Sequence, residues 1–332
     1  MKIIPLGFPW ETRDPFLFCV YHADAYPEGN EQLGPAASLG GRNIGNDFRI
    51  KDGWRMYHGS VVPGFPAHPH RGFETVTVVR KGMVDHADSL GGAGRYGNGD
   101  VQWMTAGKGI QHSEMFPLLK KERENPLELF QIWLNLPGAK KMVKPHYSMF
   151  WSEQVPRVKI SDEHGKETRL ELIAGSLEGH QPPAPPPDSW AADPDNELAI
   201  WYFEMDPDAE WTIPAASEEV YRNLYFFEGD RSVLQGKEIV PGHAAGLPAD
   251  RVHVSNGSKS GRYLFLQGRP IAEPVANYGP FVMNTRKEIQ ETYIDYQQTG
   301  FGGWPWSRQD PVHGADTGRF ARFIDGTEIV PE

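Results

Sequence analysis

Two pairs of side chains that commonly bind metals constrain this chain more than any other feature of its sequence. His68 and His70 are separated by one residue, and so are His112 and Glu114. On a β-strand, residues two apart point to the same face of the sheet. Two such strands lying side by side would direct three imidazoles and one carboxylate toward a single point. The spacing therefore predicts one metal site.

The residues around these pairs have the composition of a turn-rich β protein. Residues 75–79 read Thr-Val-Thr-Val-Val, a β-branched run that favours a strand. Lys81-Gly82 predicts a tight turn that returns as a second strand over 83–87, and further strands are expected over 101–105, 112–116 and 127–134. The chain contains 36 glycines and 29 prolines, and most of it lacks helical periodicity. An all-β fold is predicted.

A change of composition divides the chain. Residues 137–156 are polar and contain prolines, and a second set of expected strands covers 171–174, 199–205, 224–228, 229–234 and 263–267. We expect a metal-binding domain over 1–150 and a second β domain over 151–285. The histidines of this second domain have no paired spacing, so we expect it to be metal-free; they are His164, His180, His243 and His253.

One helix is expected near the end of the chain, within a final segment over 286–332. Thr285 and Glu288 have the spacing of a capping box. Apolar or aromatic residues then recur at helical spacing, and Gly300 is a suitable stop. The predicted packing face consists of Ile289, Thr292, Tyr293 and Tyr296.

Charge and composition narrow the classes of partner. The formal net charge of −11 disfavours direct binding to nucleic acid, because phosphate backbones are also negative. No apolar run reaches the roughly 18 residues that a membrane span needs. The only cysteine, Cys19, cannot form an intramolecular disulfide. By default we expect a cytoplasmic protein.

The predicted donor set is three nitrogens and one carboxylate oxygen. Structural zinc prefers a closed tetrahedron that often contains thiolates. An open N/O site, which leaves positions for water, O2 or substrate, suits Fe(II), with Mn, Ni, Cu or Zn as substitutes. The donor set therefore favours Fe(II) at this site.

The long motifs around the ligands resemble those of the pirin family. They are His-Pro-His-Arg-Gly-Phe-Glu-Thr-Val-Thr from His68, Gly-Asp-Val-Gln-Trp-Met-Thr-Ala-Gly-Lys-Gly from Gly99, and His-Ser-Glu from His112. Residues 278–285 and the helix after them also resemble the end of the family's second domain. The resemblance covers roughly residues 14–300. It implies two cupin domains, which are jelly-roll β-barrels, in tandem with a short C-terminal helix, and one iron bound by His68, His70, His112 and Glu114.

A second carboxylate competes for the fourth ligand position. The general cupin pattern would use Glu74, four residues beyond His70 and on the same strand face if the strand is regular. The pirin pattern uses Glu114, which we favour because it shares a strand face with His112. Glu74 then becomes an acid that orients an imidazole, a catalytic base, or a purely structural hydrogen-bonding group.

Other residues are weaker candidates for the site. His86 is expected roughly opposite Thr77, where it would line the pocket or point outward. His58 lies in an irregular segment and is an improbable ligand. Phe65 and Trp103 are candidates for holding a flat substrate between aromatic rings.

The resemblance implies two competing functions. One is an O2-dependent dioxygenase of the quercetin 2,3-dioxygenase type that acts on a flat aromatic, flavonol-like substrate. The other is a non-enzymatic iron protein that switches with the Fe(II)/Fe(III) state of its metal and binds a transcription factor or a metabolic enzyme. The chain departs from the family pattern in a long segment over 23–63, a proline loop over 179–194 and a tail beyond Gly300. The first departure lies next to the expected pocket, so it bears most directly on the substrate.

Overall fold

The computed structural model describes residues 1–331 and divides into two compact units, each of which is a β-barrel. The first barrel consists of Tyr21–Ile132, Leu136–Ser152 and the residues from Glu273 onward. The second barrel consists of Met1–Val20, Trp133–Asn135 and Glu153–Ala272. These units differ from the contiguous ranges 1–150, 151–285 and 286–332 that we expected. The N-terminal strand pairs within the second barrel, whereas the C-terminal helix and tail pack within the first.

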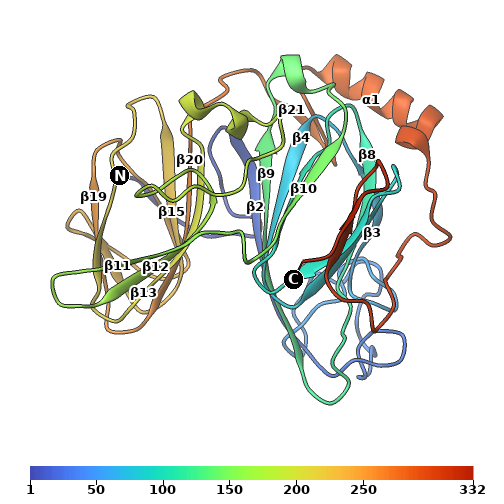
Figure 1. Cartoon of the computed structure of the whole chain (residues 1–332), viewed down its shortest axis with the longest axis horizontal. Coiled ribbons are helices and arrows are strands. Elements are labelled where there is room, and N and C mark those ends of the chain that lie inside the picture. The colour runs from blue at the N-terminus through green and yellow to red at the C-terminus, as the bar shows by residue number, and fades with distance from the viewer. Residues whose placement is uncertain (332) are drawn as a thin grey trace. The chain divides into compact units, whose positions relative to one another are not determined.

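Two sheets form the first barrel (Figure 1). The five-stranded sheet has the order β10-β7-β4-β9-β2, and the six-stranded sheet has the order β24-β23-β6-β5-β8-β3. A two-stranded hairpin, β21-β22, lies beside helix α1. The elements are β2 Phe16–Tyr26, β3 Gly64–His70, β4 Phe73–Lys81, β5 Met83–Asp88, β6 Ala93–Gly97, β7 Val101–Thr105, β8 Ile110–Met115, β9 Asn125–Asn135, η1 Gly138–Lys140, β10 His146–Phe150, β21 Ala276–Tyr278, β22 Phe281–Met283, α1 Arg286–Thr299, η4 Gly300–Gly302, β23 Phe320–Arg322 and β24 Glu328–Ile329.

A seven-stranded and a four-stranded sheet form the second barrel. Their orders are β1-β18-β15-β20-β13-β12-β11 and β14-β19-β16-β17. The elements are β1 Ile3–Pro5, β11 Arg157–Ser161, β12 Glu167–Ala174, η2 Trp190–Ala192, η3 Pro194–Asn196, β13 Ala199–Met205, β14 Glu210–Ile213, β15 Tyr221–Glu228, β16 Ser232–Leu234, β17 Lys237–Ile239, β18 His243–Gly246, β19 Val252–Asn256 and β20 Gly261–Gly268. Its core holds stacked aromatic rings, including Phe203 on Tyr263 and Phe226 on Tyr263.

The all-β prediction and the two cupin domains are confirmed. Helix α1 also begins and ends as predicted. The Thr285 side chain accepts from the Glu288 backbone N–H while the Glu288 carboxylate accepts from the Thr285 backbone N–H, and Gly300 ends the helix with a positive φ of 54°.

The predicted hairpin between β4 and β5 is wrong. Although Gly82 makes the expected turn, β4 pairs with β7 in the five-stranded sheet, whereas β5 pairs with β6 and β8 in the six-stranded sheet. The chain crosses from one sheet to the other at this turn because each sheet of the barrel buries its inner face against the other. His86 on β5 therefore lies across from Glu114 instead of Thr77.

The tail beyond the helix is ordered against the first barrel. Strand β23 pairs with β6, and the buried Arg95 donates hydrogen bonds to the backbone carbonyls of His313, Gly314 and Thr317. The same guanidinium forms an ion pair with Asp85, at 2.6 Å. The tail is therefore tied to the strand that carries His86.

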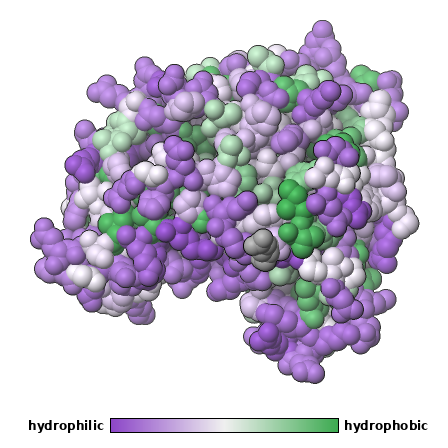
Figure 2. Space-filling model, in the orientation of Figure 1, coloured by the Kyte–Doolittle hydropathy of each residue, from purple (hydrophilic) through white to green (hydrophobic). Residues whose placement is uncertain are grey.

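The face drawn in Figure 2 is mainly hydrophilic, with hydrophobic residues in separate patches. Among residues 1–331, no helix is both long and apolar enough to cross a membrane.

Candidate metal centre

Three imidazoles meet between β3 and β8. These strands are antiparallel, and His68 lies directly opposite His112. His70 follows two residues after His68 and points to the same side, so the ring centroids are 4.5 Å apart for His68 and His112, 4.8 Å for His68 and His70, and 5.0 Å for His70 and His112. One ring nitrogen from each histidine lies within 4.8 Å of the other two. The structure thus brings together three of the four predicted ligands around one point.

Backbone carbonyls set which nitrogen two of these rings present. The Nδ1–H of His68 donates to the Pro66 carbonyl at 2.9 Å, and that of His70 donates to the Pro280 carbonyl at 3.4 Å. A carbonyl can only accept, so each Nδ1 carries the proton and each Nε2 keeps its lone pair. A hydrogen bond of this kind is the usual support of a metal-binding imidazole.

Burial keeps the three imidazoles neutral. It lowers the pKa of His68 to about 4 and holds the pKa values of His70 and His112 well below the usual range, and neighbouring imidazoles add to the shift. Both ring nitrogens of His112 are buried and have no hydrogen-bond partner within residues 1–331. Unpaired buried nitrogens are costly unless something else binds them. Neutral nitrogen donors converging on one point fit a divalent transition metal.

Glu114 borders the imidazole group. Its Oε2 lies 3.8 Å from Nε2 of His112, and its side chain is held from two sides. Thr77 donates its hydroxyl to Oε1 at 3.1 Å, and Gln131 donates Nε2 to Oε2 at 2.6 Å. Burial raises the pKa of Glu114, against the opposing effects of His86, Gln131 and Thr77. Its role as the fourth ligand stays a prediction, and its position next to His112 agrees with that role.

Glu74 does not share a strand with His70. Strand β3 ends at His70 and β4 begins at Phe73, in the other sheet. Along β4, Phe73 and Thr77 contact site residues, so the alternation of the strand directs Glu74 to the opposite face. There its carboxylate accepts a hydrogen bond from the Thr105 hydroxyl at 2.6 Å. The premise that placed Glu74 on the His70 face is therefore wrong, and a direct role as base lacks support.

His86 belongs to the site more closely than the sequence suggested. It is fully buried, lies opposite Glu114 in the register of β5 and β8, and its ring centroid is 5.6 Å from that of His112. Its Nε2 lies 3.1 Å from Oδ2 of Asp88. The His-x-Asp spacing of His86 and Asp88 is the signal that could have identified this pair, because it repeats the i, i+2 pattern of the ligands.

Aromatic side chains from the start of β3 and from the long segment before it gather next to His68. The ring of Phe65 lies 6.3 Å from that of His68, and the rings of Tyr57 and His58 lie 5.1 and 5.8 Å from Phe65. His58 is exposed, and its ring contacts that of Phe65. The expectation for Phe65 thus agrees with its position, whereas Trp103 lies opposite Val76 on the outer face of β4 and β7, the face that carries Glu74.

The sequence analysis missed a buried hydrogen-bond network next to these rings. Nδ1 of His22 lies 2.7 Å from the Tyr57 hydroxyl, which donates to Asp24 at 2.6 Å, and Asp24 forms an ion pair with Arg55 at 3.0 Å. Burial lowers the pKa of His22 to about 3, with a further contribution from Arg55. No sequence motif marks these residues, because they lie on β2 and in an irregular segment that only the fold brings together.

Comparison with known proteins shows which family the chain resembles. The model of the family described as Pirin matches residues 10–134, and the model described as the pirin C-terminal cupin domain matches residues 200–302. Pirin-1 of Arabidopsis thaliana is 39% identical over 249 residues, which cover 73% of this chain and 80% of that protein. A protein of Pseudomonas aeruginosa, named provisionally as a quercetin 2,3-dioxygenase, is 36% identical over 240 residues, covering 72% of this chain and 79% of that protein.

A solved structure has a similar fold. The crystal structure of a quercetin 2,3-dioxygenase from Acinetobacter baumannii has a TM-score of 0.71 and 26% sequence identity, covering 91% of this chain and 98% of that one. Two cupin domains with a buried group of imidazoles in the first one define a bicupin with a candidate metal centre. Within that class, the chain belongs to the pirin family.

Proposed function

We propose that this pirin is a metal-dependent dioxygenase of the quercetin 2,3-dioxygenase type, acting with O2 on a flat aromatic, flavonol-like substrate, with iron as its metal. The observation that carries the proposal is the group of three neutral imidazoles, of which His70 and His112 are buried and His68 is partly buried, beside a buried carboxylate. The similarity of the chain to a solved quercetin 2,3-dioxygenase along 98% of that protein supports it.

The residues of the site would have distinct roles. His68, His70 and His112 would hold the metal through nitrogen, and Glu114 would add the fourth bond. The bound metal would supply Lewis acidity toward an acidic hydroxyl of the substrate and a redox centre for O2. The carbonyls of Pro66 and Pro280 hold two of the imidazoles in the orientation that this requires.

The surroundings of the imidazoles suit a flat, weakly acidic substrate. Phe65 presents an aromatic ring next to His68, where it can contact the face or edge of a substrate ring. Glu114 is a buried carboxylate next to His112, and the oxygen that does not bind the metal could take a proton from a substrate hydroxyl. Buried His86 lies on the side of the site that faces β5, opposite Glu114.

Oxygen consumption with quercetin tests the proposal directly. Protein loaded anaerobically with Fe(II), with its iron content measured, is mixed with quercetin in an oxygen electrode, and the products are analysed by mass spectrometry. We expect stoichiometric O2 uptake and loss of the central ring, and neither with His112→Ala. Protein that retains one iron per chain but consumes no O2 with any flavonol would contradict the proposal.

A further inference from the structure

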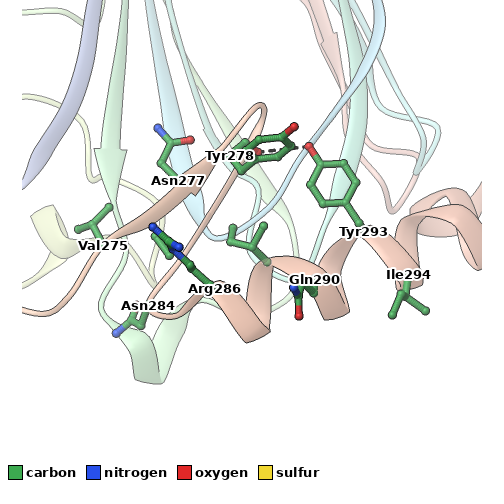
Figure 3. Close-up of a pocket in the computed structure, with 10 residues that line it drawn as sticks. Val275, Asn277, Tyr278, Asn284, Arg286, Gln290, Tyr293 and Ile294 are labelled. Carbon is green, nitrogen blue, oxygen red and sulfur yellow. Dashed lines mark hydrogen bonds between the residues drawn. The ribbon is translucent and has the colours of Figure 1, made fainter.

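A groove separate from the metal centre runs between strand β21 and helix α1 (Figure 3). It has a volume of about 1010 Å³ and is open to solvent on one side. This size is at the upper end of the range for small-molecule sites, which is about 300–1,000 Å³. We call it the β21–α1 groove.

Apolar and aromatic side chains form most of the walls. Val275 and Tyr278 contribute from the strand side, and Ile289, Tyr293 and Ile294 contribute from the helix. Three of these are unusually accessible for their type: Val275 is 48% exposed, Tyr278 67% and Ile294 53%. Tyr278 and Tyr293 meet edge to face with ring centroids 5.6 Å apart, so the groove offers aromatic contact as well as apolar area.

Three polar side chains of the groove have no partner in the described part of the chain, whereas the amide of a fourth, Asn284, donates to Glu273. Arg286, an exposed residue at the first turn of α1, makes no hydrogen bond or ion pair with any residue in 1–331, and the same holds for the side-chain amides of Asn277 and Gln290, which are also exposed. Figure 3 shows the Arg286 side chain extending from the helix toward the strand that carries Asn277. Other arginines of this barrel, such as Arg71 and Arg95, are paired with carboxylates. A guanidinium left unpaired beside an apolar wall favours a ligand carboxylate, which it can bind through two parallel hydrogen bonds.

Strand β22, which pairs with the groove strand β21, is tied to the body of the barrel. Val282 N–H donates to the Arg71 carbonyl at 3.0 Å, and the ammonium of the buried Lys141 donates to the carbonyls of Gly72 and Val282 at 2.8 and 3.2 Å. On the helix side, the Tyr293 hydroxyl donates to the Tyr278 carbonyl at 3.4 Å. A preformed groove loses little conformational freedom when a ligand enters it.

We propose that the β21–α1 groove is a binding site for a small aromatic carboxylate. The rings of the ligand lie against Tyr278, Tyr293 and Ile294, and its carboxylate pairs with Arg286, with Asn277 and Gln290 as further donors. This site is independent of the metal centre and of the proposed dioxygenase activity, because it uses other residues and an ionised ligand group.

Calorimetric titration with 1-naphthoate tests the proposal on the full-length protein. We expect saturable binding of one naphthoate per chain, and binding about tenfold weaker for Arg286→Gln, because the variant loses a charge-assisted hydrogen bond. The matched control is Lys287→Gln, the next residue along α1, which is 84% exposed, pairs with Glu291 and lies outside the groove. This control should bind naphthoate as the wild type does.

Three results would overturn the proposal. One is an affinity that Arg286→Gln leaves unchanged, and the second is equal binding of the neutral 1-naphthamide, which would show that the groove does not select an anion. The third is a self-association of the protein, seen by light scattering, that Ile294→Asp abolishes, since a second copy of the chain would then occupy the groove. Circular dichroism spectra of each variant establish that it is folded.

Discussion

Gln131 donates a hydrogen bond from Nε2 to Oε2 of Glu114 at 2.6 Å. The amide thus holds the carboxylate oxygen that lies nearest to His112. Such partners orient metal ligands, and their loss commonly costs about 10–100-fold in metal affinity. The interaction links the five-stranded sheet, which carries Gln131, to the six-stranded sheet, which carries the histidines.

Replacement of Gln131 by leucine should therefore weaken metal binding. We expect Gln131→Leu to lower the affinity for Fe(II) or Ni(II) by about tenfold, because Glu114 keeps only the bond from Thr77. Competition with a chelator measures the affinity, and Gln181→Leu, at an exposed position of the second barrel, is the control. An unchanged affinity for Gln131→Leu would argue against Glu114 as a ligand.

Substitution should distinguish the histidines that bind the metal from His86, which lies beside them. We expect His70→Ala to lose most of its bound metal, because it removes one of three converging nitrogens. His86→Ala should retain one metal per chain, because its Nε2 already faces Asp88. Elemental analysis of the purified proteins distinguishes the two. Equal metal loss in both variants would place His86 among the ligands.

The buried His22 predicts a loss of stability in acid. Its pKa falls from 6.5 to about 3 on folding, so below pH 6.5 the unfolded chain binds a proton that the folded chain does not. Stability therefore decreases as the pH drops from 6.5 toward 3, and this residue accounts for about 2 kcal/mol between pH 7 and pH 5. We expect His22→Gln, whose amide can still reach the Tyr57 hydroxyl, to show a shallower decrease.

Urea unfolding at pH 7 and pH 5 measures that difference. Other buried histidines contribute equally to both proteins, so the comparison isolates His22. Identical pH dependence in the two proteins would mean that His22 is accessible to protons in the folded state.

Arg95 should be important for stability because it is buried with its ion-pair partner Asp85 and binds three carbonyls of the tail. Removal of one partner of a buried pair typically costs about 3–5 kcal/mol, since the other charge stays buried and unpaired. We expect Arg95→Met to lose that amount in urea unfolding and to become sensitive to proteolysis after residue 303.

The double variant Asp85→Leu/Arg95→Met provides the control for that reasoning. It removes both charges and should recover part of the lost stability, while its tail stays sensitive to protease because the carbonyl contacts are still missing. Resistance of the Arg95→Met tail to protease would show that β23 and β24 hold it without the guanidinium.

The class of the fold could be predicted from the sequence, but the pairing of its strands could not. Thr75–Val79 formed the expected strand because β-branched residues suit a sheet, and α1 formed where its capping box predicted. The turn at Gly82 is local, so the sequence could reveal it. The choice of partner strands is not local, because it depends on how the two sheets bury their inner faces, and β5 joined β8 for that reason.

The metal centre was likewise predicted in part from local spacing and decided in part by strand pairing. The spacing of His68 and His70 by itself determined that two imidazoles would share one face of a strand, since alternation along a strand is a property of the backbone. The pairing of β3 with β8 then placed His112 opposite His68. Only the tertiary structure decided which acids and aromatic rings surround them. Glu74 points away from the imidazoles, whereas His86 and Gln131 lie beside them. These positions depend on pairings between strands far apart in the chain.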